Sequence, residues 1–236
     1  MPTCHRRKIT FFHITKTAGT TVEKYLGLYP TGKEDYPSYM MFGNMKDGPS
    51  QHYPFEIFYQ YRPEVEKDYF KFSFVRNPYD RMVSQYYWQL TRMRNWKGTY
   101  SFKTFLLEAE ELVSNAVYVY PAPTPYFTGD FFNNDEFMKV PTGNKIHFCP
   151  QHMYIFDEED KFKLDFFGSF ENFTDDFTRL CLTIDVNAST PPRDFRHRIH
   201  NASAGRPPYR EMYDSTTKKI VERMYEKDLD LLKYTF

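Results

Sequence analysis

The chain has 236 residues and a mass of 28.5 kDa, and 41% of its residues are hydrophobic. This is enough apolar material for a sizeable core, so we expect a single domain spanning residues 1–236. The 31 Lys and Arg residues balance the 31 Asp and Glu residues, which argues against binding to nucleic acid or another strongly anionic polymer. No apolar run approaches the ~18–20 residues that cross a membrane. We therefore expect a soluble cytoplasmic protein, or a Golgi-lumen protein only if a membrane anchor has been removed.

The first part of the chain has the pattern of a strand, a loop and a helix. Residues 8–14 (KITFFHI) are β-branched and aromatic, which is typical of a buried strand. A short polar loop follows at residues 15–19, and residues 20–28 have helical spacing of their apolar side chains. This order is typical of the start of a parallel α/β sheet.

A second buried strand is predicted at residues 70–75 (FKFSFV), with a helix to about residue 93 directly after it. Asn77 suits the N-cap of that helix, and Pro78 suits its first position. The later elements that we expect are helices over 102–114, 170–182 and 215–232, strands over 145–148 and 164–168, and loops over 115–142 and 190–208. Together these elements predict a three-layer α/β domain with a central parallel sheet.

The loop after the first predicted strand has the residue types of an anion site. Its members are Lys16, Thr17, Ala18, Gly19, Thr20 and Thr21. A helix N-terminus offers backbone N–H groups, the threonines add hydroxyls, the glycine permits close approach, and the lysine adds a positive charge. The loop lacks the glycines of a Walker A motif. An ordinary strand–helix turn with a solvated lysine is an equally good interpretation of this loop alone.

A second candidate site follows the strand at residues 70–75. Arg76 lies at the carboxyl end of that strand, where open α/β sheets bind ligands, and Ser84 lies two turns into the next helix. An arginine fork and a serine hydroxyl can jointly hold a phosphate that is distinct from the one at the first loop. Two phosphate sites suit a nucleotide that is phosphorylated at both ends. For Arg81 we expect only a surface salt bridge.

At these two motifs the chain resembles the sulfotransferases that use 3′-phosphoadenosine 5′-phosphosulfate (PAPS). FFHITKTAGTT is similar to their 5′-phosphosulfate loop, and FSFVRNPYDRMVSQYYW is similar to their 3′-phosphate motif. The carbohydrate branch, with the heparan 2-O- and chondroitin sulfotransferases, is the closer resemblance. It extends to QHMYIFDEEDKFKLDFFGSFENFTDDF and to the C-terminal tail.

The resemblance implies a fold like that of P-loop kinases and a role for each matching residue. Lys16 would stabilise the leaving 5′-phosphate, and residues 17–21 would cradle it. Arg76 and Ser84 would bind the 3′-phosphate, and a loop near Arg206 would close over the nucleotide. The products would be a sulfate ester and adenosine 3′,5′-bisphosphate.

A general base is needed to take the proton of the acceptor hydroxyl. The heparan 2-O enzymes carry a histidine just before a short helix that precedes the second motif, and His52 matches it. A neutral histidine near pH 7 suits this work. Ser50 stands where those enzymes have a second histidine, and Glu56 is the reserve candidate for the base.

The sequence gives no reason to invoke a metal, because neither the other histidines nor the three cysteines have a metal-ligand spacing. We expect those histidines to be structural or solvated, and the cysteines to be buried or spectator thiols.

The acceptor remains open between a glycan hydroxyl and a small-molecule alcohol or phenol, with N-sulfation also open. Two rival functions stay open as well, an ATP-dependent kinase of related fold and a nucleotide-binding module without catalysis. A kinase would need a Walker-type loop and carboxylates for Mg²⁺.

Overall fold

The computed structural model describes residues 1–4, 6–28, 44–45, 48–49, 52, 54–55, 59, 63–92, 100–114, 145–186 and 206–236. The chain forms two compact units. The sheet unit comprises Met1–Arg76 and Met153–Ala202, and the helical unit comprises Asn77–His152 and Ser203–Phe236. The assignment of residues 1–236 to a single domain stays a prediction.

The sheet unit is built on a four-stranded sheet. Its strands are β1 (Thr3–Cys4), β2 (Ile9–Phe12), β5 (Phe70–Val75) and β6 (Phe166–Ser169), in the order β1-β2-β5-β6. Strands β2, β5 and β6 are parallel, and β1 pairs with β2 in the antiparallel direction. This confirms the predicted α/β class, although the sequence did not predict β1. Two further short strands, β3 (Asn44–Met45) and β4 (Gly48–Pro49), pair with each other.

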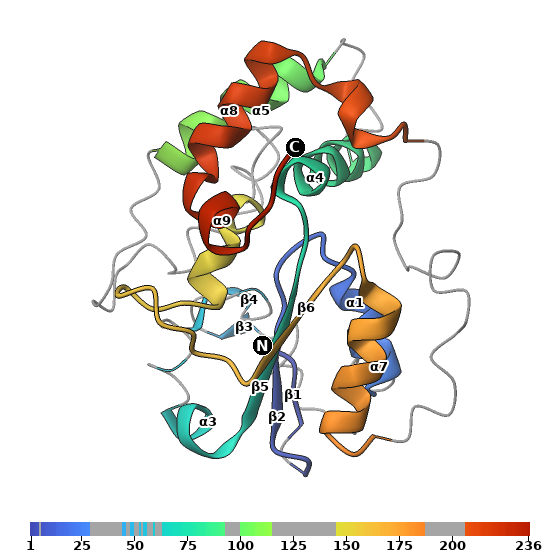
Figure 1. Ribbon diagram of the computed structural model, residues 1–236, viewed down its shortest axis with the longest axis vertical. Coiled ribbons are helices and arrows are strands. Elements are labelled where there is room, and N and C mark those ends of the chain that lie inside the picture. Colours follow the sequence, from blue (N-terminus) through green and yellow to red (C-terminus); the bar gives the residue numbers. More distant parts are fainter. Residues whose placement is uncertain are drawn as a thin grey trace. The chain divides into compact units, whose positions relative to one another are not determined.

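Helices α1 (Gly19–Tyr25) and α7 (Phe173–Thr183) lie side by side on one face of this sheet (Figure 1). The core between them and the strands consists of Ile9, Phe11, Val22, Leu26, Leu28, Phe72, Phe74, Phe173, Phe177, Leu180 and Cys181. Gly168 on β6 permits the close approach of α7, because a Cβ there would lie 2.5 Å from the Phe74 ring and 2.8 Å from Asp176 Cβ. The predicted strands and helices of this unit are confirmed, with ends shifted by one to three residues.

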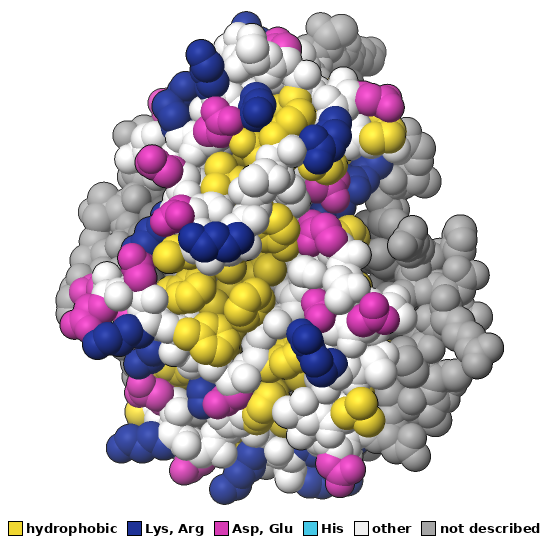
Figure 2. Space-filling model, viewed as in Figure 1, with side chains coloured by type: hydrophobic (Ala, Val, Ile, Leu, Met, Phe, Trp, Pro, Cys, Tyr) yellow, Lys and Arg dark blue, Asp and Glu magenta, His cyan; other side chains and the backbone are white. Residues whose placement is uncertain are grey.

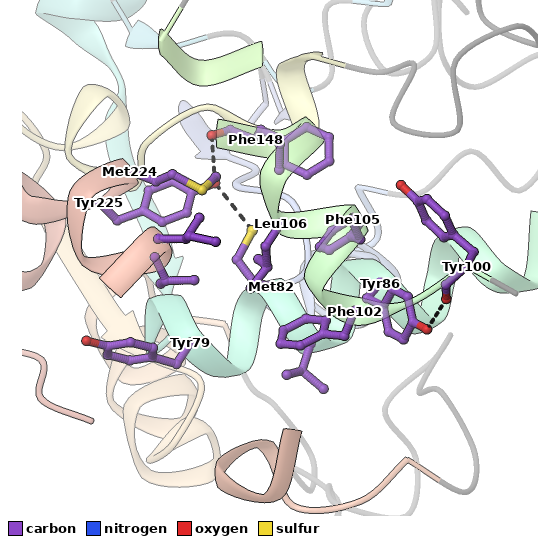
Figure 3. Close-up of a cluster of buried hydrophobic side chains, with 14 residues drawn as sticks. Tyr79, Met82, Tyr86, Tyr100, Phe102, Phe105, Leu106, Phe148, Met224 and Tyr225 are labelled. Carbon is purple, nitrogen blue, oxygen red and sulfur yellow. Dashed lines mark hydrogen bonds between the residues drawn. The ribbon is translucent and has the colours of Figure 1, made fainter. Parts of the chain in front are cut away.

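The helical unit contains α4 (Pro78–Arg92), α5 (Phe102–Ser114), α8 (Ser215–Met224) and α9 (Glu226–Leu231). Figure 3 shows its aromatic core, in which Tyr225 Oη donates to the carbonyl of Phe148 at 3.0 Å and lies 3.4 Å from Met82 Sδ. The buried members of the core are Tyr79, Met82, Val83, Tyr86, Tyr100, Phe102, Phe105, Leu106, Ala109, Phe148, Ile220, Val221, Met224 and Tyr225. Most of the unusual aromatic content of the described chain is thus core.

The start of α4 agrees with the prediction, since Asn77 Oδ1 accepts from the backbone N–H of Tyr79 at 3.0 Å. The predicted C-terminal helix is instead two helices. It breaks at Tyr225, which leaves the helical region with φ −129° and ψ 29°. Helix α8 begins with a capping box between Asp214 and Thr217. Of the remaining elements, α3 (Pro63–Asp68) and the short 3₁₀ helices η5 (Gln151–Tyr154) and η7 (Tyr209–Met212) were not predicted.

Two predictions in the helical unit are wrong for one reason. Residues 145–148 form the 3₁₀ helix η4 (Lys145–Phe148) rather than a strand, and Arg81 is fully buried rather than in a surface salt bridge. Arg81 Nη2 donates to the carbonyl oxygens of His147 at 3.0 Å and Cys149 at 2.8 Å. A buried guanidinium must be hydrogen-bonded, and carbonyls of η4 and of the residue after it supply those bonds instead of pairing with a strand.

The three cysteines are free thiols, and Cys149 and Cys181 are buried as predicted. Burial raises the pKa of the Cys181 thiol to about 11, so it stays protonated at neutral pH. On the face drawn in Figure 2, Lys and Arg side chains are interspersed with Asp and Glu side chains, in keeping with the balanced composition. None of the helices in the described part of the chain is long and apolar enough to cross a membrane.

Candidate functional site

The loop between β2 and α1 has an unusual backbone. Lys16 and Ala18 both adopt the left-handed conformation, with φ of 66° and 68°. Such residues cost on the order of 1–3 kcal/mol each, and they concentrate at ligand-binding sites. Thr17 Oγ1 donates to the carbonyl of Ile14 at 2.8 Å, and Thr21 N–H donates to the carbonyl of Ala18 at 2.8 Å. The loop is therefore held in one tight shape by its own hydrogen bonds.

Gly19, the first residue of α1, lies against the ring of His13. A Cβ on Gly19 would lie 2.0 Å from His13 Nε2 and 2.1 Å from Cδ2, so no larger residue fits. The His13 ring is itself fixed, because its Nδ1 lies 2.5 Å from Glu23 Oε1 and both residues are buried. The structure thus confirms a structural role for His13. It also shows that a glycine is needed at position 19 for packing against His13, in addition to the predicted close approach of an anion.

Arg76 follows β5 and reaches the loop after β2. Its side chain is buried, and Nη1 donates to the carbonyl of Lys16 at 2.9 Å. The guanidinium carbon lies 3.8 Å from the centroid of the Phe170 ring. Because β2 and β5 are parallel neighbours, the residues after their carboxyl ends meet at one edge of the sheet. The structure therefore brings together Arg76 and Lys16, two of the cationic residues that the sequence singled out.

His52 lies beside the same loop. Its Nδ1 is 2.8 Å from the carbonyl oxygen of His13, and the two rings meet edge to face with centroids 4.5 Å apart. A carbonyl oxygen only accepts, so Nδ1 donates, and in neutral His52 the lone pair is on Nε2. The carbonyl of His52 accepts from Tyr154 Oη at 2.7 Å. His52 is thus held at its ring and at its backbone, in the tautomer that a general base at Nε2 requires.

Two of the residues that were predicted to bind the nucleotide, Ser84 and Arg206, belong to the helical unit. Ser84 is a buried residue of α4. Arg206 pairs with Asp80 in the first turn of α4, with Nη1 2.8 Å from Oδ1 and 3.4 Å from the backbone carbonyl. Ser50, Glu56, the predicted loop over 115–142, and residues 190–205 of the predicted loop over 190–208 lie outside the described residues.

Sequence reasoning missed three side chains that support this site. Glu23 fixes His13, Tyr154 fixes the backbone of His52, and Phe170 underlies Arg76. Only Phe170 had a usable signal, because it lies two residues after the strand that was predicted to end at Gly168, near the carboxyl edge of the sheet. Among the described residues, no group of three or more His, Cys, Asp or Glu side chains is arranged to hold a metal ion.

Comparison with known proteins agrees with the two motifs. A model of the sulfotransferase family matches residues 1–235, and this range includes every residue of the candidate site. Searches of curated proteins and of solved structures found no match.

Proposed function

Because the chain belongs to the sulfotransferase family, we propose that it transfers a sulfuryl group from PAPS to a hydroxyl of a carbohydrate or small-molecule acceptor. The observation that carries this proposal is the bond from Arg76 to the carbonyl of Lys16. It joins a buried guanidinium to the strained loop after β2, and both are suited to bind anionic groups. A donor with phosphates at its 3′ and 5′ ends needs two anion-binding groups, here the guanidinium and the loop, at one edge of the sheet.

In this proposal the loop after β2 binds the 5′-phosphosulfate. Lys16 supplies the positive charge, and the backbone N–H groups of residues 17–20 supply hydrogen bonds. The Thr21 N–H donates to the carbonyl of Ala18 and holds the loop in shape. The Thr17 hydroxyl already donates to Ile14, so its backbone N–H is the better donor to the ligand. Arg76 binds the 3′-phosphate. The resemblance also assigns Ser84 and Arg206 to the nucleotide, and these two assignments rest on the sequence alone.

The transfer is a displacement at sulfur. His52 Nε2 takes the proton of the acceptor hydroxyl while the oxygen of that hydroxyl forms a bond to sulfur. The bond between sulfur and the bridging oxygen of the 5′-phosphate breaks, and adenosine 3′,5′-bisphosphate leaves with that electron pair. Lys16 and the loop amides stabilise the negative charge that develops on the leaving phosphate. Positioning and preorganised charge supply most of the rate in this scheme.

The resemblance to the heparan 2-O- and chondroitin enzymes makes a glycan hydroxyl the first acceptor to test, with a phenol or alcohol second. Zero net charge favours an acceptor less anionic than heparan sulfate. Residence in the cytoplasm stays a prediction from the sequence.

The direct test is incubation with sulfur-labelled PAPS and a panel of neutral glycans, chondroitin and phenols. We expect label in one acceptor class, with release of an equal amount of adenosine 3′,5′-bisphosphate. Transfer of labelled phosphate from ATP with Mg²⁺ would establish a kinase instead. Nucleotide binding without transfer to any member of the panel would favour a non-catalytic module.

A further inference from the structure

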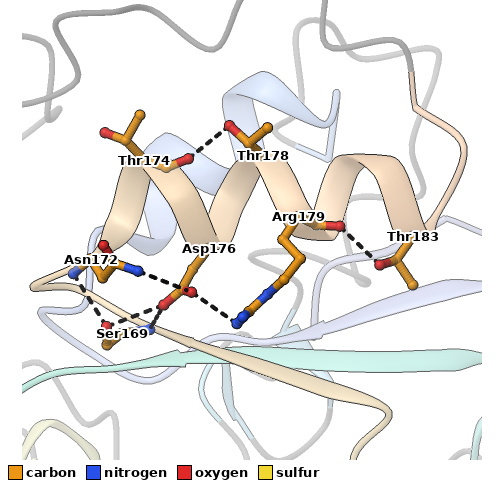
Figure 4. A network of polar contacts seen from close by, with 7 residues as sticks. All are labelled: Ser169, Asn172, Thr174, Asp176, Thr178, Arg179 and Thr183. Atoms are coloured by element: carbon orange, nitrogen blue, oxygen red, sulfur yellow. Dashed lines mark hydrogen bonds and ion pairs between the residues drawn. The ribbon is translucent and has the colours of Figure 1, made fainter.

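Phe170 lies at the carboxyl end of β6, next to the end of β5. Its backbone N–H donates to the carbonyl of Val75 at 2.7 Å, which extends the ladder between these two strands. The preceding residue, Ser169, is held by Asp176, whose Oδ2 accepts from Ser169 N–H at 2.7 Å and from Oγ at 3.1 Å (Figure 4). Asp176 is itself fixed by Arg179. The backbone at Phe170 is therefore anchored from β5 on one side and from α7 on the other.

The contact between Phe170 and Arg76 restricts how the guanidinium can lie. A separation of 3.8 Å between the guanidinium carbon and the ring centroid is van der Waals contact, and it favours a guanidinium that lies flat over the ring. The N–H groups of a flat guanidinium point outward in its own plane. One of them meets the carbonyl of Lys16, so rotation within that plane is also restricted.

From these contacts we propose that Phe170 is a positioning residue for the donor nucleotide, whose ring holds the Arg76 guanidinium in the plane that presents its N–H fork to the 3′-phosphate. This inference rests on the proposed function, because it presumes that Arg76 binds that phosphate. A bidentate contact demands a defined plane, and a ring that restricts the side chain beforehand lowers the entropy lost on binding. Phe170 then contributes to discrimination between nucleotides without touching them.

The test compares the dissociation constants of adenosine 3′,5′-bisphosphate and of AMP, which lacks the 3′-phosphate. In Phe170→Leu we expect the dissociation constant of AMP divided by that of the bisphosphate to fall by about fivefold to tenfold, through weaker binding of the bisphosphate alone. Phe170→Tyr and Phe170→Trp keep a flat ring and should keep the wild-type ratio. If Leu at this position prevents folding, Phe170→Met, which preserves volume without a ring, takes its place.

Phe166 provides a matched control, because it lies on β6 under another arginine, with Arg179 Cζ 5.4 Å from its ring centroid. Phe166→Leu should leave the ratio unchanged. In an Arg76→Ala background, Phe170→Leu should have no further effect on the ratio, since its action passes through Arg76. An unchanged ratio in Phe170→Leu, or equal weakening of both ligands, would overturn the inference while leaving the proposed function in place. A wild-type ratio near one would instead overturn the proposed function, and the inference with it.

Discussion

Replacing His52 with alanine is expected to lower kcat by about 10²–10⁴-fold, because the acceptor hydroxyl loses its general base. The nucleotide should still bind, since none of the atoms assigned to the phosphates belongs to His52. The His52 side chain also bonds to the carbonyl of His13, which lies three residues before Lys16. We therefore include His52→Asn, a side chain that can keep a donor near that carbonyl but has no basic nitrogen. It should lose as much turnover as alanine does.

The measurement is single-turnover transfer from labelled PAPS, together with calorimetry of adenosine 3′,5′-bisphosphate. His152→Ala is the histidine control, because His152 bonds through Nδ1 to buried Asp228 in the helical unit and has no assigned role. It should retain transfer. Normal turnover in His52→Ala would remove His52 from the mechanism and bring Glu56 forward as the base.

Gly19→Ala is expected to destabilise the protein by about 1–3 kcal/mol, as overpacking of a fixed site does. The new Cβ would lie 2.0 Å from His13 Nε2, and the His13 ring is held by Glu23. Either the ring or the start of α1 must move. Movement of α1 displaces the backbone N–H groups proposed for the 5′-phosphosulfate, so we also expect binding of PAPS and of AMP to weaken together.

Denaturant unfolding and calorimetry measure these two effects. Gly27→Ala is the matched control, since Gly27 has φ +64° but no heavy atom within 4 Å of an added Cβ. It should cost roughly 1 kcal/mol from its backbone conformation and leave nucleotide binding unchanged. Wild-type stability and binding in Gly19→Ala would show that the loop does not depend on the packing of His13 against Gly19.

The sequence predicted those helices and strands that have a clear local pattern, such as an apolar run, helical spacing or a capping residue. The apolar run at Phe70–Val75 and the helical spacing of Phe102–Ser114 gave both elements with their observed bounds. Asn77 and Pro78 marked the start of α4 for reasons of capping. The proximity of Arg76 and Lys16 could also be anticipated, because it follows from parallel neighbouring strands that end at one edge.

The features that the sequence did not predict depend on contacts between residues far apart in the chain. Residues Lys145–Phe148 have a strand-like composition, but the carbonyl of His147 accepts from Arg81, which lies 66 residues earlier in the chain. For His52, the sequence offered only a resemblance, and the tautomer follows from a bond to a residue 39 positions earlier. Glu23 lies in a predicted helix, and Tyr154 lies in a segment for which the sequence predicted no element, so nothing local marked their roles.

Calorimetry of the wild type and of Arg76→Ala measures whether the edge of the sheet at Lys16 and Arg76 binds a nucleotide with a 3′-phosphate. We predict that the wild type binds adenosine 3′,5′-bisphosphate more tightly than AMP, and that Arg76→Ala loses about 10–100-fold in affinity for the bisphosphate alone. Arg223→Ala, which removes an arginine of the helical unit that pairs with Glu110, should bind as the wild type does. Equal affinity for AMP and the bisphosphate, or a preference for ATP with Mg²⁺, would contradict the assignment of the donor site.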